Sequence, residues 1–230
     1  MKNLVVLSGA GVSAESGLKT FRDSGGLWEG YDVNDVATPE GWHKNPALVL
    51  EFYNQRRKSA LTAQPNQGHI IIAQLEQYFH TTVITQNVDG LHEKAGSSRV
   101  IHLHGELSKS RSTIDPELVY DIEGWELKQG DRCEKGSQLR PHIVWFGESV
   151  PMMDAAIEVT ITADIFIVIG TSLQVYPAAG LLEYVPHNTP KFIIDPNMPH
   201  VSRRPNLFLY EENGSIGMSN VRNKLLTEYL

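Results

Sequence analysis

Residues 4–14 read Leu-Val-Val-Leu-Ser-Gly-Ala-Gly-Val-Ser-Ala, an apolar run that ends in a glycine-rich turn. Four apolar residues bounded by glycine are typical of a strand buried on both faces of a parallel sheet. The spacing also fits a dinucleotide-binding turn, in which Gly9 makes the turn, Gly11 admits a pyrophosphate and Ala14 keeps the next helix close. An ordinary strand-to-helix turn carries the same glycines, so this stretch alone leaves both interpretations open.

The acidic residue that usually follows such a turn by about twenty residues, at the end of a second strand, is missing here. That interval holds Arg22-Asp23-Ser24-Gly25-Gly26-Leu27-Trp28, a glycine-rich loop with no strand around it. We therefore predict that an insertion interrupts the first βαβ unit. The inserted loop is a candidate lid over a bound cofactor.

The composition is that of an ordinary globular protein, because 41% of the 230 residues are hydrophobic and 20% are charged. A net charge of −7 argues against a nucleic-acid partner, and we expect the basic clusters Arg56-Arg57-Lys58 and Arg203-Arg204 to be solvated or locally paired. No apolar stretch approaches the ~18 residues of a membrane span, so we expect a cytoplasmic protein with no membrane partner. We also expect the protein to be a monomer. The single cysteine, Cys133, excludes an internal disulfide and a cysteine-rich zinc site.

Strands and helices alternate along the rest of the chain, which predicts an α/β doubly wound sheet. The expected strands are 81–85, 99–103, 142–146, 165–169, 192–195 and 207–209. The expected helices are 46–61, 66–79, about 152–162, one from 176 and one at the C-terminus. Between 106 and 139 the pattern dissolves into short pieces, which favours a small subdomain that leaves the sheet.

Polar residues follow several of these strands. Gln86, Asn87 and Asp89 come after one strand and His104 after the next, and Gly170-Thr171-Ser172 follows the most hydrophobic strand. Ligands of open parallel sheets bind beyond the carboxyl ends of the strands, so these side chains are candidates for a ribose, a carboxamide and a general base. Asn, Asp and Gly are also common turn formers, and a lone histidine is often structural.

Tyr53 and Arg56 lie three residues apart on the helix expected at 46–61, so they share one face. They could place a phenol and a guanidinium in one cavity. From the helix alone, the alternative is that Tyr53 packs in the core while Arg56 reaches solvent or a local carboxylate.

Six motifs together resemble the sirtuin family, in the same order and across nearly the whole chain. They are 9–17 (Gly-Ala-Gly-Val-Ser-Ala-Glu-Ser-Gly) with Thr20-Phe21-Arg22, 86–92 (Gln-Asn-Val-Asp-Gly-Leu-His), His104-Gly105, Arg140-Pro141, Phe146-Gly147-Glu148, and 170–179 (Gly-Thr-Ser-Leu-Gln-Val-Tyr-Pro-Ala-Ala). The resemblance implies one domain over 1–230, with a large Rossmann-type part (1–22, 80–106, 140–230) and a small inserted part (23–79, 107–139). It also implies NAD-dependent removal of acyl groups from protein lysines.

The resemblance further assigns site residues. The catalytic positions fall on His104, Asn87 and Asp89. The NAD positions fall on Gly9, Ala10, Gly11, Glu15, Thr20, Phe21, Arg22, Gln86, Asn87, Asp89, Gly170, Thr171, Ser172, Asp195, Asn197 and Gly214. The substrate positions fall on Ala37, Tyr53, Arg56, Val144, Phe146, Gly147 and Glu148, with the acylated peptide lying extended against 146–148.

The sequence departs from the family pattern in two places. Most sirtuins carry two Cys-x-x-Cys pairs that bind a structural zinc, but here that interval offers only Cys133, so we expect no zinc. We expect apolar contacts from Leu118, Val119, Trp125 and Leu127 to hold 107–139 instead. In addition, Lys19 stands where a proline is usual, which should loosen the start of the cofactor loop slightly.

Tyr53-x-x-Arg56 and Ala37 resemble the sirtuin subgroup that prefers succinyl and malonyl groups. A guanidinium and a phenol at the end of an acyl tunnel would bind a distal carboxylate through charge-assisted hydrogen bonds. We therefore expect removal of succinyl and malonyl groups and, to a lesser extent, acetyl. Two other functions stay open: a non-catalytic NAD-binding sensor and a protein ADP-ribosyltransferase.

Overall fold

The structure is a computed structural model that describes residues 1–19, 27–28, 30–202 and 205–230. The predicted cofactor residues Thr20, Phe21 and Arg22 lie outside the described residues. The strands are β1 (Asn3–Ser8), β2 (Leu27–Trp28), β3 (Tyr31–Asp32), β4 (His80–Thr85), β5 (Val100–His102), β6 (Gly105–Ser112), β7 (Val119–Asp121), β8 (Leu139–Ile143), β9 (Ile165–Ile169), β10 (Lys191–Ile194) and β11 (Leu207–Tyr210). The helices are α1 (Gly11–Ala14), α2 (Val33–Val36), α3 (Pro39–Lys44), α4 (Pro46–Thr62), α5 (Gln67–Gln74), η2 (Leu75–Gln77), α6 (Leu91–Lys94), α7 (Met153–Thr160), η3 (Ala178–Gly180), α8 (Leu181–Tyr184) and α9 (Gly214–Glu228).

The large sheet has six parallel strands in the order β11-β10-β9-β1-β4-β5. β1 lies inside it and pairs with β4 on one side and β9 on the other, which is why Leu4–Leu7 are apolar without alternation. The predicted α/β fold with a Rossmann-type sheet is therefore confirmed. The predicted strands 81–85, 165–169, 192–195 and 207–209 differ from the observed ones by at most one residue at each end.

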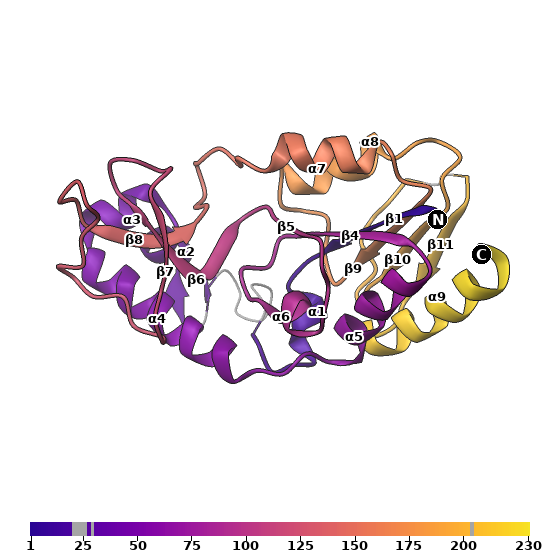
Figure 1. Ribbon diagram of the computed structural model, residues 1–230, viewed down its shortest axis with the longest axis horizontal. Helices are drawn as coiled ribbons and strands as arrows, with labels where there is room; N and C mark the ends of the chain where they lie inside the picture. The colour runs from indigo at the N-terminus through magenta and orange to yellow at the C-terminus, as the bar shows by residue number, and fades with distance from the viewer. Residues whose placement is uncertain (20–26, 29, 203–204) are drawn as a thin grey trace.

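Helices cover both faces of this sheet (Figure 1). One face carries α5 and α9, whose Ile71, Ile72 and Val221 pack with strand residues in a buried cluster. The other face carries α7 and α8, whose Ala156 and Leu182 are buried with strand residues in a second cluster. The predicted small part 23–79 included α5, but α5 packs on the large sheet. The division into two parts stays a prediction.

The small part holds a three-stranded antiparallel sheet, β7-β6-β8, beside α2, α3 and α4 (Figure 1). The predicted parallel strand 142–146 is wrong, because the observed strand is β8, which pairs antiparallel with β6. At the start of this pairing Gly105 lies opposite Ile143; its φ is +82°, and a Cβ there would lie 2.0 Å from the His142 carbonyl oxygen. A short apolar run does not reveal the direction of the strand with which it pairs, so the hydrophobic pattern alone could not have prevented this error.

Polar contacts from α4 hold the segment between β7 and β8, rather than the four apolar side chains predicted for it. Of those four, only Leu127 is buried; Leu118 is half-buried, and Val119 and Trp125 are exposed. Asn54 instead binds both backbone groups of Leu127: its Nδ2 donates to the carbonyl at 3.0 Å, and its Oδ1 accepts from the amide at 2.9 Å.

Arg57 strengthens this contact. We expected a side chain that is solvated or locally ion-paired, but it is 1% exposed and donates to the carbonyls of Trp125, at 2.8 Å, and Leu107. Burial lowers its pKa to about 10, so it remains charged at neutral pH. The guanidinium bonds to these carbonyl oxygens instead of to water, which ties α4 to β6 and to the segment that follows β7.

Asn54→Ala should lower the free energy of unfolding by about 2–3 kcal/mol, because two buried backbone groups of Leu127 lose their partner. Gln55→Ala is the matched control, since Gln55 is exposed on the same helix and its side chain bonds only to Glu51 among the described contacts. Urea denaturation of both variants measures the effect. Equal losses in the two variants would show that this contact does not hold the segment.

Candidate active site

A cavity of about 440 Å³ lies between the large sheet and the small part. Every predicted site residue that the structure describes lines it. These residues are Gly9, Ala10, Gly11, Glu15, Ala37, Tyr53, Arg56, Gln86, Asn87, Asp89, His104, Val144, Phe146, Gly147, Glu148, Gly170, Thr171, Ser172, Asp195, Asn197 and Gly214. The carboxyl ends of parallel strands and the loops of the small part thus meet in one place, while the individual roles stay predictions.

At the sheet end of the cavity, two glycine turns interlock. A Cβ on Gly9 would lie 2.7 Å from the Thr171 Cβ, and one on Gly11 would lie 2.8 Å from the Gly170 Cα. The Gly11 amide donates to the Gly170 carbonyl at 2.8 Å. The first requirement for these glycines is therefore the close approach of the turn after β9, a constraint that the motif itself does not reveal.

Gly170→Ala should be strongly destabilising, because φ there is +64° and a Cβ would lie 2.2 Å from the Val12 amide nitrogen. We expect a loss of about 2–5 kcal/mol from backbone strain and overpacking together. Gly124→Ala separates the two terms, since φ at Gly124 is +76° but nothing lies within 4 Å. Thermal and urea unfolding should show a clearly smaller loss for Gly124→Ala; similar losses would mean that the interlock adds nothing.

A buried polar cluster lies behind these turns. The Ser13 hydroxyl donates to Asp89 Oδ2 at 3.0 Å and accepts from Asn87 Nδ2 at 3.1 Å. Burial raises the pKa of Asp89, while the hydroxyl and the Leu91 amide oppose that rise. Asn87 is 6% exposed, and its Oδ1 has no hydrogen-bond partner among the described residues. Such an acceptor calls for a ligand with an N–H donor, as in a carboxamide.

His104 is oriented for proton transfer. Its Nδ1 donates to the Gln86 carbonyl at 3.0 Å, which leaves the lone pair on Nε2. Burial lowers its pKa from the usual 6.5, so the ring is neutral near pH 7. Gln86 is itself held by a 3.1 Å bond from its Nε2 to the Thr171 hydroxyl. The histidine at the rim is thus ready to accept a proton.

Tyr53 and Arg56 line the other end of the cavity. Tyr53 is fully buried, and its oxygen accepts a hydrogen bond from the Trp145 indole at 3.1 Å. Burial raises its pKa, so the phenol keeps a hydrogen to donate. The guanidinium carbon of Arg56 lies 4.2 Å from the Trp28 ring centroid and 5.7 Å from that of Phe52. Both aromatic faces attract the cation through their ring quadrupoles.

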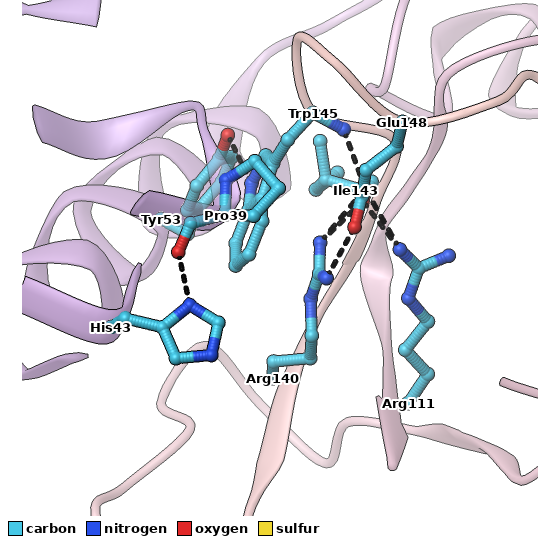
Figure 2. A network of polar contacts seen from close by, with 8 residues as sticks. All are labelled: Pro39, His43, Tyr53, Arg111, Arg140, Ile143, Trp145 and Glu148. Atoms are coloured by element: carbon cyan, nitrogen blue, oxygen red, sulfur yellow. Dashed lines mark hydrogen bonds and ion pairs between the residues drawn. The ribbon is translucent and has the colours of Figure 1, made fainter. Parts of the chain in front are cut away.

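Glu148, predicted as a substrate residue, uses its carboxylate to fix the turn at 145–148 (Figure 2). Arg140 binds both carboxylate oxygens, at 2.6 and 3.1 Å, and Arg111 binds one at 3.0 Å. The Trp145 amide also donates to it, at 2.8 Å. Burial would raise the pKa of Glu148, but these contacts outweigh it and lower that pKa. The turn therefore holds the Trp145 indole against Tyr53.

Sequence reasoning missed several residues of this site. Ser13 organises the polar cluster, Trp145 orients Tyr53, and Trp28 supports Arg56. Ser13 stands inside the quoted motif, so a hydroxyl two residues after Gly11 was the available signal. The two tryptophans gave none, because only the fold brings them to α4.

The sequence model of the Sir2 family matches residues 9–177, more than half of the chain. The chain therefore belongs to the Sir2 family, which confirms the resemblance to sirtuins. A protein of Bacteroides thetaiotaomicron named NAD-dependent protein deacylase is 52% identical over 98% of this chain and 99% of its own length. A Helicobacter pylori protein of the same name is 51% identical over 98% of this chain and 96% of its own.

Solved structures agree with this assignment. A Sir2 homologue in complex with NAD superposes with a TM-score of 0.88 at 38% identity, covering 98% of this chain and 90% of that one.

Among the described residues, no three or more His, Cys, Asp or Glu side chains are grouped so as to hold a metal ion. Within the same residues, none of the helices has the length and apolar character to cross a membrane. Whether the protein contains zinc is a question for elemental analysis, and we expect less than a tenth of an equivalent per chain.

Proposed function

We propose that this member of the Sir2 family is an NAD-dependent protein-lysine deacylase that prefers acyl groups ending in a carboxylate, such as succinyl and malonyl. The enzyme class follows from relatives of about 50% identity that carry the name NAD-dependent protein deacylase. The observation that supports the acyl preference is the presence of Tyr53 and Arg56 on the wall of the same cavity as His104.

The residues of the cavity fit NAD. The unpartnered Asn87 Oδ1, beside the buried Asp89, suits the carboxamide of nicotinamide. The glycine turns at Gly9–Gly11 and Gly170–Ser172 suit the phosphates, and Glu15, Asp195 and Asn197 suit the adenosine side. When bound, NAD would supply the ribose carbon that loses nicotinamide and bonds to the acyl oxygen, and the ribose hydroxyl that finally carries the acyl group.

The role of His104 in this reaction is that of a general base. Its Nε2 would accept a proton from a ribose hydroxyl, so that this hydroxyl oxygen can bond to the acyl carbon; the lysine amine then leaves, and water supplies the remaining oxygen. The Gln86 carbonyl on Nδ1 fixes the required tautomer and favours the imidazolium that forms. The cluster of Ser13, Asn87 and Asp89 holds the nicotinamide end in register with this base.

The acyl end is selected by charge. A carboxylate at the acyl tip would form a bidentate pair with Arg56 and accept a hydrogen bond from Tyr53. The indole of Trp145 uses one lone pair of the Tyr53 oxygen and leaves the phenol hydrogen for the ligand. An acetyl group has no carboxylate to pair with Arg56 or Tyr53, so it gains less binding free energy at this end of the cavity.

Nicotinamide release tests the proposal. Purified protein is incubated with NAD and one lysine peptide in succinylated, malonylated, acetylated or unmodified form. We expect release to depend on an acylated peptide and to be faster with succinyl and malonyl than with acetyl. No release with any peptide would favour the NAD sensor, and release with transfer of ADP-ribose to protein would favour the transferase.

A further inference from the structure

His102 is the last residue of β5, and His104 follows it in the turn that leads to β6. Their rings contact consecutive carbonyls of the loop after β4. His104 Nδ1 donates to Gln86 O at 3.0 Å, and His102 Nδ1 donates to Asn87 O at 3.2 Å. The two histidines thus tie both residues of this loop to the end of β5.

The second nitrogen of His102 is also engaged. Its Nε2 lies 2.7 Å from Glu93 Oε1 on α6, in an ion pair whose histidine side chain is 10% exposed and whose glutamate side chain is 44% exposed. A carbonyl and a carboxylate only accept hydrogen bonds, so both ring nitrogens must carry a hydrogen. The geometry therefore requires the charged imidazolium form of His102.

The surrounding charges agree with this form. Burial alone would lower the pKa of His102, but the bond and charge of Glu93, with Glu106 and the Asn87 carbonyl, outweigh burial and raise that pKa. Asp89 is a further anion close enough to interact, and His92 lies on the same helix as Glu93. Burial would raise the pKa of Glu93, but the bond and charge of His102, with a smaller contribution from Lys109, lower it, so the carboxylate stays charged beside His102.

We propose that His102, held in its charged form by Glu93, is a positioning residue that fixes Asn87 at the nicotinamide end of the cavity. The assignment of the ligand rests on the proposed function. Because the Asn87 side chain offers Oδ1 to the ligand while its Nδ2 binds Ser13, a shift of its backbone carbonyl moves both contacts. His102 itself does not line the cavity, so it acts only through this loop.

The proposal predicts a pH dependence. The bridge is complete above the lowered pKa of Glu93 and below the raised pKa of His102. As the pH rises through the His102 value, the neutral ring keeps one hydrogen and can no longer donate to both Asn87 and Glu93. Affinity for NAD should therefore weaken on the alkaline side by about three- to tenfold, the equivalent of one hydrogen bond.

Calorimetric titration of the whole protein with NAD, at a series of pH values, tests this without turnover. His102→Gln should bind NAD about three- to tenfold more weakly near neutral pH and lose the alkaline weakening, because glutamine does not titrate. Glu93→Gln should keep the weakening but move it to lower pH. His80→Gln, a change at an exposed histidine, is the matched control and should follow the wild type.

Wild-type affinity and an unchanged pH profile in His102→Gln would overturn the proposal. So would a lower melting temperature in both variants with no change in the profile, since that result describes a merely structural pair. Failure of the proposed function is a separate outcome, namely NAD binding by the wild type without nicotinamide release from any acylated peptide. A wild type that does not bind NAD would refute both.

Discussion

His104→Ala should reduce deacylation by about 10²–10⁴-fold, the usual cost of losing a general base. The ring is half-buried and its described bond is to one backbone carbonyl, so the fold should survive the change. Turnover is measured with NAD and a succinylated peptide, and NAD binding is measured alongside it. Binding should remain, because the glycine turns and the Asn87 cluster are untouched.

The pH dependence of the deacylation rate tests the assignment of His104 independently. Burial lowers the pKa of His104 below 6.5, so Nε2 is unprotonated and competent at neutral pH. On the acid side, activity should fall as the His104 ring becomes protonated, at a pH below 6.5. His43→Ala is the control, since His43 is exposed on α3 and outside the cavity. Ordinary turnover in His104→Ala would rule out His104 as the base.

Arg56→Met should abolish the preference for succinyl over acetyl. Removing one partner of a desolvated charge pair costs about 2–5 kcal/mol, so the wild type should prefer succinyl by well over tenfold in kcat/KM. Methionine keeps an unbranched, largely aliphatic side chain but loses the charged guanidinium that lies over Trp28 and Phe52. The loss should therefore fall on the succinyl substrate and leave the acetyl substrate nearly unchanged.

Two further variants sharpen this test. Tyr53→Phe should weaken the preference less, by about 1–3 kcal/mol, the value of a hydrogen bond to a charged acceptor. Lys58→Met is the matched control, because Lys58 is an exposed cation on α4 that stacks on Trp125 outside the cavity. If Arg56→Met leaves the ratio as it is in the wild type, the Tyr53–Arg56 pair does not select the acyl group.

Much of the large sheet could be predicted because its strands are continuous apolar runs, and burial on both faces permits little else. The run Leu4–Leu7 and the strand Ile165–Ile169 were placed within a residue for this reason. The strand at 139–143 was not, since its residues do not show that it pairs antiparallel with β6. Strand identity is local in the sequence, while pairing direction depends on a distant partner.

The site shows the same division. Residues that follow strands, such as Asn87 and His104, could be predicted because the carboxyl ends of parallel strands meet at one edge. The contacts that position these residues could not be predicted. Ser13 joins Asn87 and Asp89, Arg111 holds Glu148, and Arg57 is buried against carbonyls, and each of these depends on chain segments far apart in the sequence.

The most direct test of the central claim is one competition experiment. Wild-type protein is given NAD with equal concentrations of a succinyl-lysine and an acetyl-lysine peptide, and the small-molecule products are identified by mass spectrometry. We predict nicotinamide with O-succinyl-ADP-ribose in more than about tenfold excess over O-acetyl-ADP-ribose, as the charge-pair energy requires. Equal amounts of the two products, or ADP-ribose attached to protein in their place, would contradict the account.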